Sequence, residues 1–299
     1  MDPKPSAQAA PPDMNGIVWL ASYPKSGNTW TRNFLHNVLN IIEKGADAPQ
    51  DINAMNELTF WEISARWYQK HLGKPVSEAT RDEIAAVRPK VQEEIADSID
   101  GLALVKTHHA LVMDHGVPLI NFAVTAGAVY IVRNPLDVAI SFASHMGTTV
   151  DEAIDQMAMK NLETEISETS VHEVYCSWSR HVDSWTRKAH QSIYVMRYEN
   201  MLADTVRIFG GLARHLLLRP TEEQLRLAVD RSSFEVLKKQ EDAAGFREKP
   251  EKAQRFFREG KSGQWHETLS RRQVRRIVQD HHAQMARFGY LTDDLKGLI

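Results

Sequence analysis

The sequence predicts an α/β fold, a single domain with a central, mainly parallel sheet flanked by helices. Short apolar runs, typical of strands buried on both faces, alternate along the chain with segments of helical periodicity. The first run leads through a turn-like stretch into a helix, a P-loop-like strand-loop-helix at the N-terminus. In this chain of 299 residues we expect a flexible tail over residues 1–15 and one domain over residues 16–299.

The expected elements follow one another in a strand–helix alternation. A strand at 17–21 precedes a loop at 23–27 and a helix from residue 28, in which Trp30, Phe34 and Val38 recur at helical spacing. Further buried strands are expected at 102–105, 129–132 and 193–196, with helical patterns at roughly 78–98, 135–146 and 168–190. The aromatic segment 49–76 is expected to form a helical cap, and the apolar stripe at roughly 270–288 a last helix.

Composition narrows the class of protein. The net charge of −3 provides no global basic field for nucleic acid or an anionic membrane. The single cysteine, Cys176, excludes an intramolecular disulfide and a cysteine-based metal cluster. A chain without disulfides is typical of a reducing compartment. The N-terminal stretch has neither the apolar core of a signal peptide nor the arginines of a transit peptide, and no apolar run reaches the length of a membrane span. We therefore expect a cytoplasmic enzyme.

The loop Tyr23–Trp30 has the composition of a phosphate-binding loop. Its backbone amides are expected to cradle a phosphate-like group, and Lys25 to supply a positive charge. However, Lys25 comes before Ser26 and Gly27, so the nucleotide-hydrolase spacing G-x-x-x-x-G-K-[ST] is absent. Judged alone, the stretch is equally compatible with an ordinary turn that exposes a lysine.

Two further patches come at the ends of predicted strands. Lys106 and His108 share one face of an extended chain, and a neighbouring cation keeps an imidazole neutral and able to accept a proton. Arg133 follows the next strand, and together with Ser141 it could hold a second anion. The alternatives are a structural histidine in the first patch and an Arg133–Asp137 ion pair in the second.

A fourth patch, the basic, glycine-containing stretch 257–265, could close over a bound phosphate. Alone, it is better explained as a solvated loop.

Together the patches resemble the cytosolic-type sulfotransferases, which use 3′-phosphoadenosine 5′-phosphosulfate (PAPS). The family's loop Y-P-K-S-G-T-T-W appears as Tyr-Pro-Lys-Ser-Gly-Asn-Thr-Trp at 23–30, and its K-T-H stretch as Lys-Thr-His at 106–108. Its R-N-x-x-D-V-x-x-S signature is intact at 133–141, S-F-x-x-[ML]-K is matched at 233–238, and R-K-G-x-x-G-D-W, with changes, at 258–265. The Tyr-Glu-Asn run at 198–200 resembles the family's Y-E-D. The likeness covers residues 17–290.

The resemblance implies a role for each matching position. His108 would be the general base, and Lys25 and Lys106 would stabilise charge on the transferred group, so that no metal is needed. Residues that would bind the 5′-phosphate and the adenine are Lys25, Ser26, Gly27, Asn28, Thr29 and Trp30. Residues that would bind at or near the 3′-phosphate are Arg133, Ser141, Tyr198, Ser232, Arg258 and Gly260.

The sequence also departs from the family's pattern. Asn28 replaces a threonine but still offers polar groups to a phosphate, whereas Glu259 replaces a lysine and removes a positive charge near the 3′-phosphate. The vertebrate dimer motif K-x-x-x-T-V-x-x-x-E is not evident, so that mode of dimerisation is unsupported and the oligomeric state stays open.

The acceptor is expected to be a hydroxylated small molecule such as a phenol, an alcohol or a lipid-like metabolite, with an amine less favoured. Its pocket is expected from apolar and aromatic residues: Phe60, Trp61, Trp67, the stretch from Met113 to Phe122, Met146 and residues 240–257. Three alternatives remain open: a P-loop kinase or hydrolase, which would require Mg²⁺; a non-catalytic nucleotide-binding protein; and a sulfotransferase of the secretory pathway. Binding of adenosine 3′,5′-bisphosphate (PAP) without metal would separate the first from the sulfotransferase reading.

Overall fold

The centre of the molecule is a five-stranded parallel sheet. The computed structural model describes residues 15–249, 255–257 and 259–298. The sheet has the order β2-β3-β1-β6-β7, and every neighbouring pair runs parallel. Its strands are β2 (Thr59–Trp61), β3 (Leu102–Thr107), β1 (Gly16–Ser22), β6 (Thr125–Val132) and β7 (Ile193–Arg197). The predicted α/β class and its central parallel sheet are therefore confirmed.

Both faces of the sheet are covered, which explains why its strands read as apolar runs. In β1, Ile17, Trp19 and Ala21 belong to one hydrophobic core, and Val18 and Leu20 to another on the opposite face. The side chains of β6 divide between the two cores in the same alternating way. Alternate residues of a strand point to opposite faces, so a strand covered on both sides is apolar at every position.

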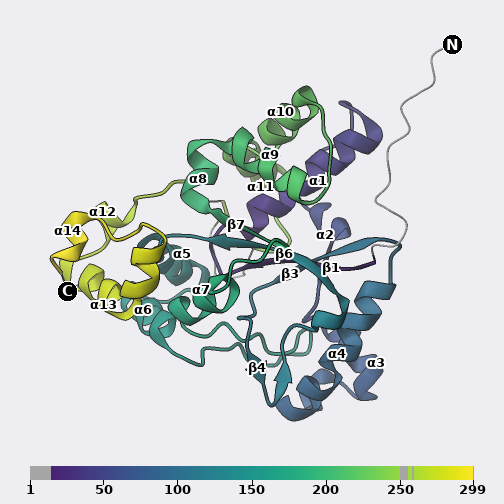
Figure 1. Cartoon of the computed structure of the whole chain (residues 1–299), viewed down its shortest axis with the longest axis horizontal. Coiled ribbons are helices and arrows are strands. Elements are labelled where there is room, and N and C mark those ends of the chain that lie inside the picture. Colours follow the sequence, from purple (N-terminus) through teal and green to yellow (C-terminus); the bar gives the residue numbers. More distant parts are fainter. Residues whose placement is uncertain (1–14, 250–254, 258, 299) are drawn as a thin grey trace.

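The two sets of helices lie on opposite sides of the sheet (Figure 1). One core is closed by α1 (Asn28–Lys44), α9 (Thr205–His215) and α10 (Glu222–Arg231). The other is closed by α4 (Arg81–Asp97), α5 (Pro135–Met146), α6 (Val150–Ala158), α7 (Trp178–Thr186) and α13 (Arg271–Arg287). The remaining elements are α2 (Met55–Leu58), α3 (Ala65–Leu72), α8 (Tyr198–Ala203), α11 (Phe234–Ala244), α12 (Trp265–Thr268), α14 (Asp293–Lys296), the 3₁₀ turns Val76–Glu78 and Phe122–Val124, and the hairpin β4 (Met113–Asp114) with β5 (Val117–Pro118).

Two expected elements differ in the structure. The helix expected at roughly 168–190 is confined to α7. Residues 159–177 form an irregular segment whose backbone makes hydrogen bonds with other segments of the chain. The amide of Ala110, for example, donates to the carbonyl of Val174. The segment 49–76, expected to be a helical cap, contains the edge strand β2 as well as α2 and α3. The predicted tail lies outside the described residues except for Asn15.

The strand order fixes where a ligand can bind. β1 lies between β3 and β6. After β1 the chain forms β2 and β3 on one side of this strand and then β6 and β7 on the other. In parallel sheets such a switch point leaves a crevice at the carboxyl ends of the strands. In this sheet the crevice lies beside Ser22 of β1, Thr107 of β3 and Val132 of β6.

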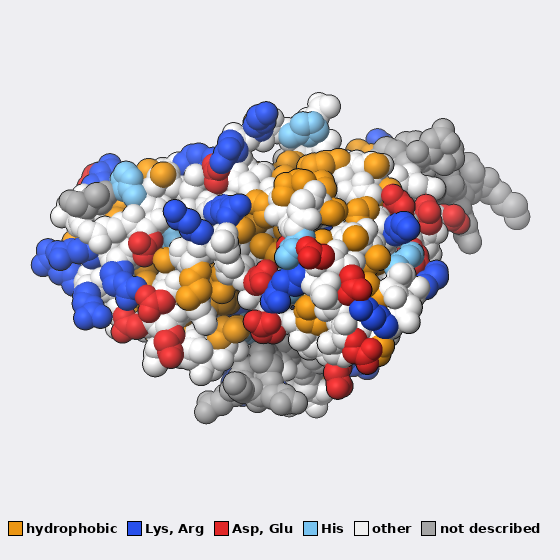
Figure 2. All heavy atoms as spheres, turned by 90° about the horizontal axis from the view of Figure 1, so that it is seen from below, with side chains coloured by type: hydrophobic (Ala, Val, Ile, Leu, Met, Phe, Trp, Pro, Cys, Tyr) orange, Lys and Arg blue, Asp and Glu red, His pale blue; other side chains and the backbone are white. Residues whose placement is uncertain are grey.

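Charge is distributed unevenly over the surface. On the face shown in Figure 2, Lys and Arg gather at the left end, where α13 and α14 lie in Figure 1, and elsewhere acidic and basic side chains are interspersed. The exposed arginines of α13 include Arg271, Arg272 and Arg275. No helix in the described part of the chain has the length and apolarity that crossing a bilayer requires.

Candidate active site

The loop between β1 and α1 has the backbone of an anion-binding turn. Lys25 and Gly27 both adopt positive φ, 67° and 109°, which turns the chain sharply before α1 begins at Asn28. The first amides of a helix have no partner within the helix and attract anions. The hydroxyl of Ser26 is buried and has no hydrogen-bond partner within the described structure. A buried donor left in this state is suited to a ligand oxygen.

The next three residues, Asn28, Thr29 and Trp30, join the loop to β1 and line the cavity. The Asn28 amide donates to the carbonyl of Leu20 at 2.8 Å, so this group is bonded to β1, and the Asn28 Oδ1 atom is buried without a partner among the described residues. Thr29 and Trp30 line the cavity in front of the loop. The Trp30 ring meets Tyr198 edge-on, with ring centroids 5.8 Å apart.

His108 is held as a neutral imidazole with one free nitrogen. Its Nδ1 lies 2.7 Å from the carbonyl oxygen of Ser22, which can only accept, so Nδ1 carries the proton and Nε2 keeps its lone pair. Its backbone amide donates to Glu173 at 2.6 Å. Burial and then the charge of Lys106 lower the pKa of His108 well below its usual value. His108 therefore has the tautomer and the charge state of a general base.

Two ammonium groups share the cavity with His108. Lys25 Nζ lies 3.5 Å from the Nδ1 of His145 and 4.2 Å from the centroid of the Phe256 ring. Lys106 Nζ lies 5.9 Å from the Trp61 ring. Burial and the charge of Lys25 lower the pKa of His145 to about 4, so His145 is a neutral neighbour of the cations.

Arg133 links the loop to the segment before α12. Its guanidinium donates to the carbonyls of Lys25 at 3.0 Å and Lys261 at 3.1 Å, and lies over the Tyr198 ring at 4.3 Å. The alternative pairing with Asp137 is not made, because Asp137 accepts the amides of Gly263 at 2.7 Å and Trp265 at 3.2 Å. Arg133 is therefore held by neutral carbonyls and keeps its charge for an anion.

Of the other residues expected around the 3′-phosphate, Ser141, Tyr198 and Gly260 line the same cavity as Arg133. Gly260 has φ 60°, and a Cβ there would lie 2.4 Å from the Phe234 ring. Arg258 lies outside the described residues. Ser232 does not reach the cavity, because its buried hydroxyl donates to the carbonyl of Ala228 and accepts from Asn37.

These residues surround one cavity of about 900 Å³. Of the acceptor-pocket residues expected from the sequence, those that line it are Phe60, Trp61, Met146 and, from the stretch 240–257, Arg247, Glu248, Arg255, Phe256 and Phe257. The stretch from Met113 to Phe122 does not, because it forms the β4–β5 hairpin, in which the Met113 side chain is 59% exposed. Trp67 also lies outside the cavity lining and packs against Phe60.

Sequence reasoning missed the acidic partners of the site. Glu173 holds the backbone of His108, and Glu248 pairs with Arg32 of α1 at 2.8 Å. Burial opposes the ionisation of Glu248, but Lys106, Arg32 and Lys25 outweigh it and lower its pKa. Both carboxylates come from irregular segments, where no periodicity marks a residue's direction.

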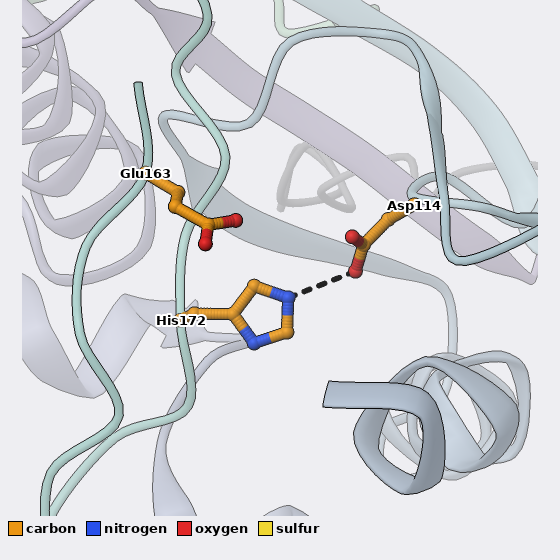
Figure 3. Close-up of side chains that lie close together, drawn as sticks. All are labelled: Asp114, Glu163 and His172. Atoms are coloured by element: carbon orange, nitrogen blue, oxygen red, sulfur yellow. Dashed lines mark hydrogen bonds and ion pairs between the residues drawn. The ribbon is translucent and has the colours of Figure 1, made fainter. Parts of the chain in front are cut away.

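A second cluster of titratable side chains consists of residues that do not line the cavity. Asp114, Glu163 and His172 each present one ligand atom within 4.8 Å of the others (Figure 3). Their carboxylates already face cations, since Arg88 donates to Asp114 at 2.8 Å and Arg81 pairs with Glu163 at 2.8 Å. Guanidinium groups at that distance repel a metal ion, and we assign the cluster to a buried ion-pair network.

Taken together, the loop amides and Arg133 can hold anionic groups, while His108 can take a proton beside the ammonium groups of Lys25 and Lys106. This arrangement can transfer an anionic group to a hydroxyl nucleophile by positioning and charge stabilisation.

Comparisons with known proteins give a consistent result. A family model described as "Sulfotransferase domain" matches residues 16–289. The 3-beta-hydroxysteroid sulfotransferase of Cavia porcellus is 25% identical over 74% of this chain and 65% of its own length, and sulfotransferase 1E1 of Mus musculus is 23% identical over 82% and 75%. The match thus covers just under two thirds of the first of these curated relatives.

Solved structures share the fold. Mouse sulfotransferase SULT7A1 complexed with PAP has a TM-score of 0.59 at 18% identity, with 95% of this chain and 87% of that chain covered. Retinol dehydratase in a complex with retinol and PAP has a TM-score of 0.61 at 18% identity, with 91% and 82% covered.

Proposed function

Because this chain belongs to the sulfotransferase domain family, we propose that it transfers a sulfuryl group from PAPS to the hydroxyl of a small molecule, without a metal. The products would be the sulfate ester and PAP. The observation that carries the proposal is the meeting of the loop Tyr23–Trp30, Lys106, His108 and Arg133 around one cavity. We place the reaction in the cytoplasm, in keeping with a single, buried cysteine, Cys176.

The cavity suits a nucleotide with two separate anionic groups. The loop amides would bind the 5′-phosphosulfate, and Arg133 with Ser141 would bind the 3′-phosphate. Ser26 is fully buried and is not part of the cavity lining, so its hydroxyl, which has no partner among the described residues, would reach a phosphate only if the loop shifts. Trp30 offers an aromatic ring beside the loop for the adenine. When bound, PAPS would supply the sulfuryl group, and the phosphate of PAP would be the leaving group of the transfer.

His108 would act as the general base. As the acceptor oxygen forms its bond to sulfur, the bond between sulfur and the phosphate oxygen breaks and the electron pair leaves with the phosphate. The acceptor's proton passes to Nε2 of His108, the nitrogen that the Ser22 carbonyl leaves without a proton.

Lys25 and Lys106 would stabilise the charge that develops during transfer. Lys25 belongs to the loop that would hold the 5′ end, and Lys106 lies in β3, the strand that His108 follows. Cations aimed at the developing charge in a partly closed cavity lower the barrier without reorganisation during the reaction.

The first test of the function is binding of PAP by isothermal titration calorimetry in metal-free buffer. We expect tight binding that weakens roughly 10- to 100-fold in Arg133→Ala, because a charged hydrogen bond to a phosphate contributes about 1.5–3 kcal/mol. Arg272→Ala, which removes an exposed arginine of α13, should bind PAP like the wild type.

The titration separates a sulfotransferase from a kinase, and an assay of sulfation separates it from a non-catalytic protein. A preference for ATP with Mg²⁺ over PAP would contradict the proposal in favour of a kinase. Tight PAP binding without sulfation of any hydroxylated acceptor would instead indicate a non-catalytic nucleotide-binding protein.

A second prediction concerns Gly27. In Gly27→Ala the new Cβ would lie 2.8 Å from the Tyr198 ring while φ stays at 109°, so the loop must shift. We expect PAP affinity to fall at least about tenfold. Gly45→Ala is the matched control, because Gly45 also has positive φ, 85°, but nothing lies within 4 Å of its Cβ position. Equal PAP affinities of the two variants would contradict a role for the loop.

A further inference from the structure

The cavity is more polar than the sequence suggested for an acceptor site. Beside the aromatic rings of Phe60, Trp61 and Phe256 it presents hydroxyl groups and charged groups. Its lining includes the hydroxyl groups of Ser64 and Ser144, which none of the proposed anion sites uses. Other hydroxyls of the lining are bonded within the chain: Thr164 accepts the amide of Glu173 at 2.8 Å, and the Ser167 hydroxyl lies 3.0 Å from that of Ser170. An apolar metabolite would leave Ser64 and Ser144 without the hydrogen bonds that water gives them.

The acidic side chains of the cavity lining are already engaged. Asp137 and Glu173 accept backbone amides, and Glu165, Glu248 and Glu259 pair with Arg81, Arg32 and Lys261. Among the described residues of the lining, these five carboxylates face seven Lys and Arg side chains, so positive charge is in excess. Among the cations, Arg255 pairs with Asp242 at 2.7 Å.

Two arginines of the lining stand apart from these pairs. Arg66, on α3, lies over the Trp67 ring at 4.7 Å, and Arg247 follows α11. Within the described parts of the chain neither guanidinium has an ion-pair partner, and both residues are exposed. The two come from segments distant in the sequence that border the same cavity.

We propose that the acceptor carries an anionic group, a carboxylate or a phosphate, which Arg66 and Arg247 bind while its hydroxyl faces His108. This inference rests on the proposed function and names the substrate class of the same site. A guanidinium binds a carboxylate or phosphate through two parallel hydrogen bonds, which fixes the orientation of the acceptor. The aromatic rings of Phe60 and Trp61 would cover its apolar body.

The proposal departs from a neutral steroid or retinoid acceptor. Such molecules carry no group for Arg66 and Arg247, and they would cover both charges with apolar surface at a desolvation cost. The positive charges of Arg66 and Arg247 would also draw anionic acceptors toward the cavity and slow cationic ones.

The test compares acceptors that share one phenol and carry an anionic, neutral or cationic group on a short side chain. Initial rates are measured at saturating PAPS with 3-(4-hydroxyphenyl)propanoate, its methyl ester, tyramine and 2-(4-hydroxyphenyl)ethyl phosphate. We expect kcat/KM to be at least about tenfold higher for the carboxylate or the phosphate than for the ester, and lowest for the ammonium compound. The better of the two anions identifies the group that the arginines prefer.

The variants Arg66→Gln, Arg247→Gln and the double variant assign this preference. Each single change should raise KM for the anionic acceptor about threefold to fivefold, because each arginine is exposed and its ion pair is screened. The double change should remove the preference, and kcat should change little because the arginines do not touch the reacting atoms. Arg275→Gln, an exposed arginine of α13, is the control of equal charge change.

Equal kcat/KM for the anion and the ester, no turnover of either anion, or an unchanged preference in the double variant would overturn the proposal. The proposed function is judged separately by PAP binding, which does not involve Arg66 or Arg247. A protein that binds PAP and sulfates the ester or a neutral steroid in preference would keep the function and lose the anionic acceptor.

Discussion

Replacing His108 by alanine is expected to lower kcat by roughly 10²- to 10⁴-fold, the usual contribution of a general base. The reason is the bond from Nδ1 to the Ser22 carbonyl, which leaves Nε2 as the proton acceptor in the cavity. PAP affinity should change little, because the proposed phosphate contacts come from the loop and Arg133. Steady-state kinetics and calorimetry on the same preparation measure both quantities.

The pH profile provides an independent check of the base. His108 accepts a proton only while it is neutral, and burial with Lys106 lowers its pKa well below 6.5. The wild-type kcat/KM should therefore be retained on acidification through the range where an ordinary histidine becomes protonated, and fall only at lower pH. The control for His108→Ala is His282→Ala, which replaces an exposed histidine of α13 and should leave kcat/KM unchanged. Near-normal turnover of His108→Ala would show that another group takes the proton.

Replacing Arg88 by methionine is expected to lower the free energy of unfolding by about 3–5 kcal/mol, the loss typical when one partner of a buried ion pair is removed. Arg88 lies between Glu62, at 3.6 Å, and Asp114, at 2.8 Å, and its side chain is fully buried. Methionine keeps much of the volume, so the loss reports the two uncompensated carboxylates rather than a cavity. Urea unfolding measures it.

The pH dependence of this loss identifies its origin. In the wild type, burial opposes the ionisation of Glu62, but His109 and Arg88 outweigh it and lower the pKa of Glu62 to about 2. Without Arg88 that compensation weakens, so the carboxylates should take up protons at higher pH and the difference in stability should shrink as the pH falls. Arg272→Met, on the surface, should stay within about 0.5 kcal/mol of the wild type. A loss below about 1 kcal/mol in Arg88→Met would contradict a network held together by its guanidinium.

The core strands and the loop could be predicted from the sequence because their signals are local. Strands buried on both faces are apolar throughout, His108 and Arg133 directly follow such strands, and Lys25 lies in the loop after another. The short edge strand β2 and the irregular segment 159–177 escaped, because their structure depends on pairing with distant residues. The Glu173–His108 and Arg32–Glu248 bonds join residues 65 and 216 positions apart, and no local pattern announces them.

Ser232 and the stretch from Met113 to Phe122 show a different limit. Both carry residue types suited to a binding site, a hydroxyl in one and apolar side chains in the other. Their direction is decided by packing: the Ser232 hydroxyl turns to Asn37 and Ala228, and the hairpin holds Met113 away from the cavity. Residue type alone does not reveal such a choice.

The hydrogen bond from Arg133 to the Lys25 carbonyl makes the two proposed phosphate sites one mechanical unit. Under the proposed function, a phosphate bound by Arg133 would lie beside the loop that holds the other end of the nucleotide. A nucleotide with a phosphate at the 5′ position alone would forfeit the contact with Arg133. The enzyme would thus read the spacing between two charges, and the abundant 5′-nucleotides of a cell, which lack the second charge, would compete poorly.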